Sequence, residues 1–457
     1  MKLGRLNVNL QELKGFSLKR TARIIKDGML EGWYLKGDPA SEDRKRLIMC
    51  NYTSNVIANL IGGTFWTGLL IVLNADDSFI GTMSMISTAA NMLQCLSPLL
   101  LERFPKRRTL LSILRAVLYF INVLMIGLIP LFPVARQTKL YFTGIGVLLV
   151  NIINAFIAPG LSIWHVQSLP HKVRRSYFSL ITMTVGAVVA ICNLLGGWVV
   201  DAFTAHDMQY YGLLTLRIVA AVLCGFEIWM YFHIREYPYE GSDAGFKVKD
   251  LVTKPFKEKT YLLTVCVTFL WNFTANIPGS YYSVYLLRDV GMSYSMLTLI
   301  SMINVPIVLF LTPIWRKVLT KFGWFRTLYT SMTVYLVHYL VLALVTKQTS
   351  WIYPFSQLLG FIFAVGINLS FTGIPYVNMP EKNQTVFIGF YSTVANFAAL
   401  LGVTLGKYFI LSTEEIHFEI LGLAFGNKQL IVVLTACLMC FAVFGIHLIS
   451  KRVKSDC

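Results

Sequence analysis

The feature that most constrains this chain is a series of apolar stretches, each about as long as a lipid bilayer is thick. At about 1.5 Å per residue, roughly 20 apolar residues in a helix cross the hydrocarbon core. Such stretches recur along most of the 457 residues, near 48–73, 79–101, 109–132, 141–166, 177–201, 211–234, 260–285, 293–315, 326–346, 351–375, 387–410 and 429–450. Because helices satisfy their own backbone in lipid, the sequence predicts an all-α polytopic membrane protein with about twelve transmembrane helices.

The distribution of charge predicts the orientation of these helices. Only 14% of the residues are charged, against about 25% in soluble proteins, which excludes a soluble core. Of the 40 Lys and Arg residues, 32 lie in the first 46 residues, in alternate connections or in the last residues. The positive-inside rule assigns such segments to the cytoplasm. We therefore expect both termini in the cytoplasm, a plasma or inner membrane location, and lipid headgroups rather than nucleic acid as the partner of the positive charge.

The longest polar interruption divides the twelve stretches into six and six. Leu169-Pro170 and Gly196 in the first half are echoed in the same order by Met379-Pro380 and Gly406 in the second, which favours a duplicated six-helix unit. The expected domains are a basic amphipathic segment over 1–46, a six-helix bundle over 47–233, a loop over 234–259, a second six-helix bundle over 260–450 and a tail over 451–457. Both an interfacial helix and a disordered tail fit the first segment.

Amide side chains occur in the middle of several apolar stretches, where they destabilise a lipid-facing helix unless they face a cavity or a partner. In each half, the third and sixth stretches are the poorest in such amides, so we expect these two to face lipid. Packing between helices is the competing explanation, because Asn and Gly also promote close contact in bilayers. We predict a solute pathway lined by Asn55, Asn59, Trp66, Asn151, Asn154, Asn272, Asn276, Tyr281 and Asn396.

The seventh stretch combines amides with helix-breaking residues. Asn272 and Asn276 precede Ile277-Pro278-Gly279, and Tyr281 follows. Proline removes a backbone hydrogen bond and glycine loosens the helix, so we expect a bend or a break. Interruptions of this kind mark substrate sites in transporters, although a static kink is the alternative.

Few charged residues fall inside the stretches. Arg115 and Arg217 lie close enough to a helix end for their side chains to reach the interface. Glu227 lies at a depth similar to that of Arg115, and we hypothesise an ion pair between the third and sixth helices with a separation below about 6 Å. A proton relay through Glu227 is the rival hypothesis.

Enzymatic and metal chemistry find no support in the sequence. The histidines are scattered without metal-ligand spacing, and we see no nucleophile with its base. Cys437 and Cys440 form a C-x-x-C on an apolar helix, which favours packing. The stretch Gly402 to Lys407 falls short of a phosphate-binding loop by one spacer residue. We expect no catalytic residue, metal or cofactor.

The loop between the second and third helices resembles the signature of the major facilitator superfamily. In PLLLERFPKRRTLL, from Pro98 to Leu111, an acid–Arg pair is followed by a basic pair, although prolines replace the glycines of the family. The corresponding loop of the second half keeps a basic residue and a glycine. The resemblance implies two bundles that rock about a central site, with gating roles for Glu102, Arg103, Lys106, Arg107, Lys321 and Gly323.

Together these features predict a secondary active or facilitated transporter for a small, neutral polar solute such as a sugar. Amides and aromatic rings at mid-depth favour this class, because they bind hydroxyl groups and stack on rings. We expect a monomer, with a proton or sodium ion as the coupling ion where transport is active. The alternative is a proton-driven exporter of amphipathic compounds, but the fifth helix reads CNLLGG at Cys192 to Gly197 and lacks the proline of such antiporters.

Overall fold

The structure is a computed structural model that describes residues 38–97, 101, 104, 107–167, 174–236, 253–380, 384–420 and 423–452. Several sequence predictions lie outside these ranges. They concern the segment up to residue 37, the loop residues Glu102, Arg103 and Lys106, most of the central loop, and the last residues of the tail.

The first half of the chain runs six times between the two ends of the molecule, and we call each of these runs a passage. Their elements are α2 (Pro39–Ile61) with α3 (Gly63–Val72); α4 (Asp77–Met92) with η2 (Leu93–Leu96); α6 (Arg107–Tyr119) continued by η3 (Phe120–Met125), α7 (Ile126–Leu128) and η4 (Ile129–Leu131); α8 (Arg136–Gln167); α9 (Arg174–Thr204); and α10 (Gln209–His233). We call this half the first bundle.

The second half also makes six passages, here called the second bundle. After η6 (Pro255–Lys257) come α12 (Lys259–Ala275) with α13 (Tyr281–Val284) and η7 (Tyr285–Val290); α14 (Tyr294–Met302) with α15 (Asn304–Phe322); α16 (Trp324–Ala343); α17 (Ile352–Gly373) with η8 (Ile374–Tyr376); α18 (Gln384–Ser412); and α19 (Asn427–Arg452). The strands β1 (His417–Ile420) and β2 (Leu423–Gly426) form an antiparallel hairpin before α19, with Phe418 opposite Phe425.

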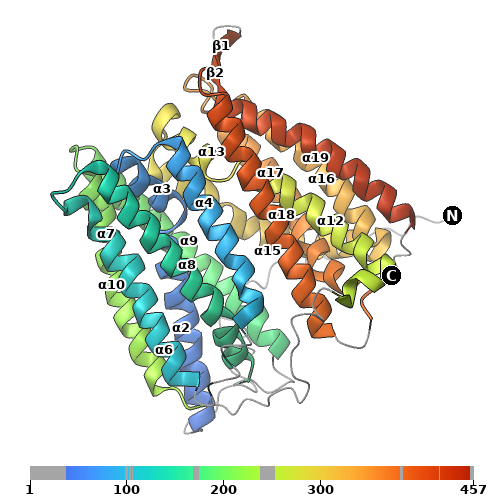
Figure 1. The fold of residues 1–457 in the computed structure, drawn as a ribbon, viewed down its shortest axis with the longest axis horizontal. Coiled ribbons are helices and arrows are strands. Elements are labelled where there is room, and N and C mark those ends of the chain that lie inside the picture. Colours follow the sequence, from blue (N-terminus) through green and yellow to red (C-terminus); the bar gives the residue numbers. More distant parts are fainter. Residues whose placement is uncertain are drawn as a thin grey trace, which may run out of the picture.

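The twelve passages confirm the predicted fold class. Nine helical segments among the described residues are long and apolar enough to span a membrane. The other passages are α4 with η2, the broken α12–α13 pair, and α16. Figure 1 shows the two bundles side by side, with the hairpin projecting at one end of the molecule. We call this end the hairpin side and the end where α2 and α6 begin the opposite side.

The first helix begins earlier than its apolar stretch. The Asp38 side chain caps α2 by accepting hydrogen bonds from the backbone N–H groups of Ala40 and Ser41, and Pro39 occupies the first turn. Both features favour a helix start at this point. Residues 39–46 are therefore helical, and the first passage begins before the apolar stretch at which we expected it to start.

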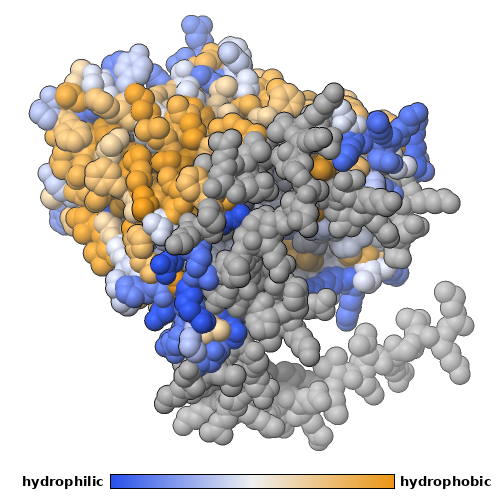
Figure 2. All heavy atoms as spheres, turned by 60° about the horizontal axis from the view of Figure 1, so that its bottom comes forward, coloured by the Kyte–Doolittle hydropathy of each residue, from blue (hydrophilic) through white to orange (hydrophobic). Residues whose placement is uncertain are grey.

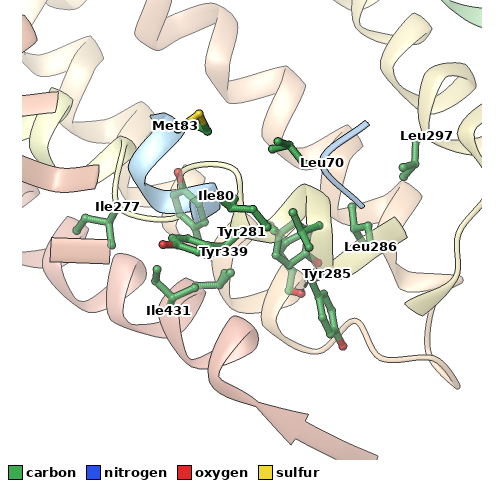
Figure 3. Close-up of a cluster of buried hydrophobic side chains, with 14 of the residues drawn as sticks. Leu70, Ile80, Met83, Ile277, Tyr281, Tyr285, Leu286, Leu297, Tyr339 and Ile431 are labelled. Atoms are coloured by element: carbon green, nitrogen blue, oxygen red, sulfur yellow. Dashed lines mark hydrogen bonds between the residues drawn. The ribbon is translucent and has the colours of Figure 1, made fainter. Parts of the chain in front are cut away.

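The bundles share one hydrophobic cluster on the hairpin side. Figure 3 shows part of this cluster, in which Leu70, Ile80 and Met83 of the first bundle lie with Ile277, Tyr281, Tyr339 and Ile431 of the second. The other clusters are each confined to one bundle. Among the described residues, this shared cluster therefore joins the two bundles on the hairpin side.

The outer surface is apolar. Figure 2 shows hydrophobic side chains covering the flank of the molecule, with hydrophilic residues gathered towards its edges. Val222 on α10 and Phe441 on α19 are 70% and 73% exposed, which fits the expected lipid-facing sixth helix of each bundle. Phe310 on α15, in the eighth passage, is exposed to a similar extent, at 71%.

Candidate functional site

A cavity of about 290 Å³ lies within the first bundle, and we call it the first-bundle cavity. It is formed by the first four passages, from α2 to α8. Its lining combines hydroxyls, amides and aromatic rings with one guanidinium, and consists of Ser54, Ile57, Ala58, Ile61, Gly62, Trp66, Ser87, Arg115, Leu118, Tyr119, Asn122, Val147, Val150, Asn151 and Asn154.

A second cavity, of about 520 Å³, lies between the bundles, and we call it the interbundle cavity. Its lining consists of Trp66, Met83, Ser84, Ser87, Thr88, Ala275, Asn276, Pro278, Gly279, Ser280, Tyr282, Tyr339, Leu342, Val403 and Val432. Trp66 and Ser87 line both cavities, so the two adjoin. Together they form the central cavity, to which both bundles contribute.

Four of the predicted pathway residues line the central cavity: Trp66, Asn151, Asn154 and Asn276. The Asn151 amide donates to the Val147 carbonyl at 2.8 Å, and the Asn276 amide donates to the Asn272 carbonyl at 2.7 Å. Each of these two side chains therefore still has its oxygen available as an acceptor for a bound solute.

The other four predicted amides lie outside the linings of these two cavities. Asn55, Asn272 and Asn396 each donate to the carbonyl four residues earlier in their own helix, at 2.8, 2.9 and 2.9 Å. Asn59 does the same at 2.9 Å and also accepts a hydrogen bond from Asn193 of α9 at 3.3 Å. In this conformation the Asn59–Asn193 bond joins two helices of the first bundle.

The seventh passage breaks where the sequence predicts it. Residues 276–280 separate α12 from α13, and Gly279 has a φ of 49°, a value that favours glycine. Beyond the break, Tyr282 lines the cavity and its hydroxyl donates to the Leu342 carbonyl at 2.9 Å. Tyr281 is instead 1% exposed, with its hydroxyl donating to the Asp77 carbonyl at 3.2 Å. Tyr281 therefore belongs to the contact between bundles in this conformation.

An ion pair lies behind the wall of the first-bundle cavity. The Nε of Arg115 is 3.3 Å from Oε1 of Glu227, within the separation that the sequence hypothesis requires. The other oxygen, Oε2, accepts a hydrogen bond from the Tyr119 hydroxyl at 2.6 Å. Nη2 of Arg115 donates to Oγ of Ser54 at 2.7 Å. The carboxylate is completely buried and the guanidinium lies at the cavity surface.

Polar contacts close the hairpin side above the shared cluster. The Asp77 carboxylate at the start of α4 lies 3.2 Å from Nη2 of Arg288 and 3.5 Å from Nζ of Lys428. The Asp201 carboxylate of α9 accepts the backbone N–H groups of Tyr294 and Ser295 at 2.8 Å each, and so caps α14 of the other bundle.

Two further contacts join α4 to the second bundle. Nζ of Lys407 donates to Oγ1 of Thr82 at 2.7 Å, and the hydroxyl oxygens of Ser84 and Ser280 lie 3.1 Å apart. Among described residues, these hydrogen bonds between bundles all lie in the hairpin-side half of their passages.

Three of the predicted gating residues are described by the structure. The backbone N–H of Arg107 donates to the Glu236 carboxylate at 2.8 Å, which places an anion at the start of α6. Gly323 joins α15 to α16 with a φ of 78°, which explains the glycine. Lys321 is exposed beside the Phe322 ring. Gating by these residues stays a prediction.

Some lining residues were missed in the sequence. Ser84, Ser87 and Thr88 form one polar face of α4, and their spacing of three and four residues was the available signal. Arg115, Tyr119 and Asn122 line the cavity from the third passage, which we expected to face lipid because it is poor in amides. That expectation fails on one face of this passage.

Solved structures share the fold at low sequence identity. A mutant of the nucleoside transporter NupG aligns with a TM-score of 0.66 and 12% identity, over 90% of this chain and 100% of that chain. A D-xylose–proton symporter gives 0.63 and 14%, over 90% and 97%. A bacterial homologue of the human lysosomal transporter Spinster, inward-facing and unoccupied, gives 0.62 and 14%, over 92% and 98%.

No curated protein matches the sequence. The family model described as Major Facilitator Superfamily, however, matches residues 47–403. This match covers well over half of the chain and includes every passage that lines the first-bundle cavity. With twelve passages in two bundles around a central cavity, the chain belongs to the Major Facilitator Superfamily.

Proposed function

We propose that this protein is a secondary transporter that moves a small polar solute through the central cavity, and that it is not an enzyme. The observation that carries the proposal is a polar cavity to which both bundles contribute, closed on one side by contacts between the bundles. Amides, hydroxyls and the Trp66 and Tyr282 rings suit hydroxyl-bearing solutes such as sugars or nucleosides. Because Glu227 balances the charge of Arg115, the charged groups at the cavity have no net charge. A solute that crosses without net charge, alone or with its coupling ion, therefore fits the cavity.

The proposed orientation places the hairpin side outside the cell. The opposite side receives the basic connections, and the positive-inside rule assigns these to the cytoplasm. The conformation described here is then closed to the outside, in keeping with its likeness to an inward-facing homologue of Spinster.

In the proposed mechanism the two bundles rock about the solute. Opening the hairpin side separates Asp77 from Arg288 and Lys428 while the bundles approach each other on the opposite side. A bound solute that touches both bundles lowers the free energy of the change, because it interacts differently with the two states. Coupling to a proton or sodium gradient determines whether the solute accumulates.

Uptake into proteoliposomes tests this function. We expect at least one radiolabelled solute from a panel of sugars, nucleosides and their carboxylate derivatives to accumulate or exchange, and Trp66→Ala to reduce its uptake at least tenfold because this residue lines both cavities. Trp351→Ala is the matched control, since Trp351 is 64% exposed and outside both linings. The assay is run with and without pH and sodium gradients.

Two outcomes would count against the proposal. Uptake by the Trp66→Ala protein equal to that of the unaltered protein would remove the central cavity from the pathway. Transport restricted to cationic amphipathic dyes would favour the alternative of drug export.

A further inference from the structure

Arg115 is the one charged side chain in the described linings of the central cavity. Its guanidinium uses only part of its hydrogen-bonding capacity. Nε contacts Glu227, Nη2 donates to Ser54, and the guanidinium carbon lies 4.5 Å from the centre of the Tyr119 ring. Its side chain is 11% exposed, so it is accessible from the cavity. Two more polar lining residues, Asn151 and Asn154, come from α8.

The counter-ion of Arg115 lies behind it. Glu227 is 0% exposed, and Arg115 and Tyr119 separate its carboxylate from the cavity. A solute in the cavity can therefore touch the cation but not the anion. Arg115 can donate further hydrogen bonds to a solute at the cavity surface. Glu227 can affect that solute only through its interaction with Arg115.

We propose that the transported solute carries an anionic oxygen group, such as a carboxylate, which binds Arg115, and that Glu227 takes up one proton when it binds. This inference rests on the proposed transport function and names its substrate class. Guanidinium groups bind carboxylates through parallel N–H donors, and the Nη1–Nη2 edge of Arg115, beside the bond to Ser54, provides such donors at the cavity surface.

Charge balance is the reason for the coupled proton. With Glu227 ionised, the pair is neutral, and an added anion leaves a net negative charge in a region of low dielectric constant. When Glu227 gains a proton, Arg115 is left with the solute anion as its partner, and the whole is neutral again. Anion and proton then cross together as a neutral unit, with no covalent step.

Other titratable groups surround Glu227. They are Tyr119 on α6, Cys50 on α2, Cys224 and Tyr231 on α10, and His165 on α8; the described side chains of α9 near this level, from Thr184 to Ile191, include none. Thiols and phenols ordinarily stay neutral at physiological pH, so His165 is the rival proton acceptor. Its ring nitrogens lie 3.0 and 3.1 Å from the carbonyls of Leu161 and Leu47.

Matched pairs of probes test the inference on the purified full-length protein. We use lactate with lactamide, gluconate with glucose, and benzoate with benzamide, and we measure binding by thermal shift and by the fluorescence of Trp66, identified by its loss in Trp66→Phe. We expect the anionic member of at least one pair to bind at least tenfold more tightly than its neutral partner at pH 5.5. Its apparent Kd should rise about tenfold per pH unit once Glu227 is ionised.

Variants separate folding from binding. The double variant R115Q/E227Q keeps a neutral pair and should lose the preference for the anion. E227Q alone should bind the anion with no pH dependence, and His165→Gln should keep the pH dependence. Matched controls are R452Q and E415Q, which alter exposed residues outside the cavity linings and should bind as the unaltered protein does.

Three results would overturn the inference. They are equal or weaker binding of every anion compared with its neutral partner, unchanged anion binding in R115Q/E227Q, and a pH dependence that survives E227Q. Transport of neutral solutes in proteoliposomes together with any of these would leave the proposed transport function standing. Absence of all transport would remove the function itself.

Discussion

At the scale of single residues, the buried Glu227 carboxylate has a partner for each of its two oxygens. Arg115 balances its charge and Tyr119 donates to its second oxygen. The depth of Arg115 and Glu227 in their helices was enough to suggest their pairing. Depth does not show which way a side chain turns between neighbouring helices, so the exposure of Arg115 to the cavity could not be predicted.

We predict that Glu227→Ala destabilises the protein by about 3–5 kcal/mol, because it leaves the Arg115 cation without its counter-ion. Tyr119→Phe removes one hydrogen bond to the same carboxylate and should lower stability by about 1–3 kcal/mol. Unfolding in denaturing detergent, followed by circular dichroism, measures both. Glu227→Ala with unaltered stability would show that the pair makes no net contribution to the fold.

Tyr281 and Tyr282 show where residue patterns stop being informative. Tyr281 was the candidate for the pathway, but it is buried between the bundles, and its neighbour Tyr282 lines the cavity instead. The periodicity of α12 cannot be extended across residues 276–280, because the break there changes the direction of the following turn. Sequence could predict the break but not which tyrosine would face the cavity.

At the scale of elements, two glycines allow α18 to pack directly on the backbone of the seventh passage, at α12 and at the break that follows it. A Cβ atom added to Gly402 would lie 2.2 Å from the Phe273 carbonyl oxygen, and one added to Gly406 would lie 2.0 Å from that of Ile277. The sequence indicated that this stretch is no phosphate-binding loop and that Gly406 corresponds to Gly196 of the first half, but it did not predict this contact. Small residues four apart permit close helix contact in membranes, which explains both glycines here.

Gly406→Ala should therefore push α18 away from α12 and lower stability by about 1–3 kcal/mol. Gly225→Ala is the matched control, since an added Cβ at this position of α10 meets nothing within 4 Å. It should leave stability unchanged or raise it by about 1 kcal/mol. Thermal unfolding of the two variants side by side measures the difference, and equal stabilities would mean that the helices adjust without loss.

At the scale of the whole molecule, the number of passages and their division into two bundles could be predicted, because both follow from hydrophobic length and loop position. The conformational state could not. Asp77 and Arg288 are far apart in the chain, and their contact depends on how the bundles tilt. The same sequence encodes every state of a transport cycle, so no residue pattern selects one of them.

The double variant S84C/S280C tests the rocking motion of the bundles. The two hydroxyl oxygens lie 3.1 Å apart across the interface, so we expect the cysteines to form a disulfide and hold the hairpin side closed. Uptake should fall at least tenfold after oxidation and recover after reduction. Each single cysteine variant serves as the control. Full uptake by the cross-linked protein would contradict a cycle that opens this side.

The capping of α14 by Asp201 has a consequence for the energetics of transport. Its carboxylate accepts two backbone N–H groups of the other bundle, and both partners sit at a helix end. When the bundles part, water can hydrogen-bond to the freed carboxylate and amides almost as well as they bond to each other. The loss of this cap then adds little to the free energy needed to open the hairpin side in the proposed cycle. In that cycle the gradients of the solute and of its coupling ion, rather than the strength of this contact, would decide which way the solute flows.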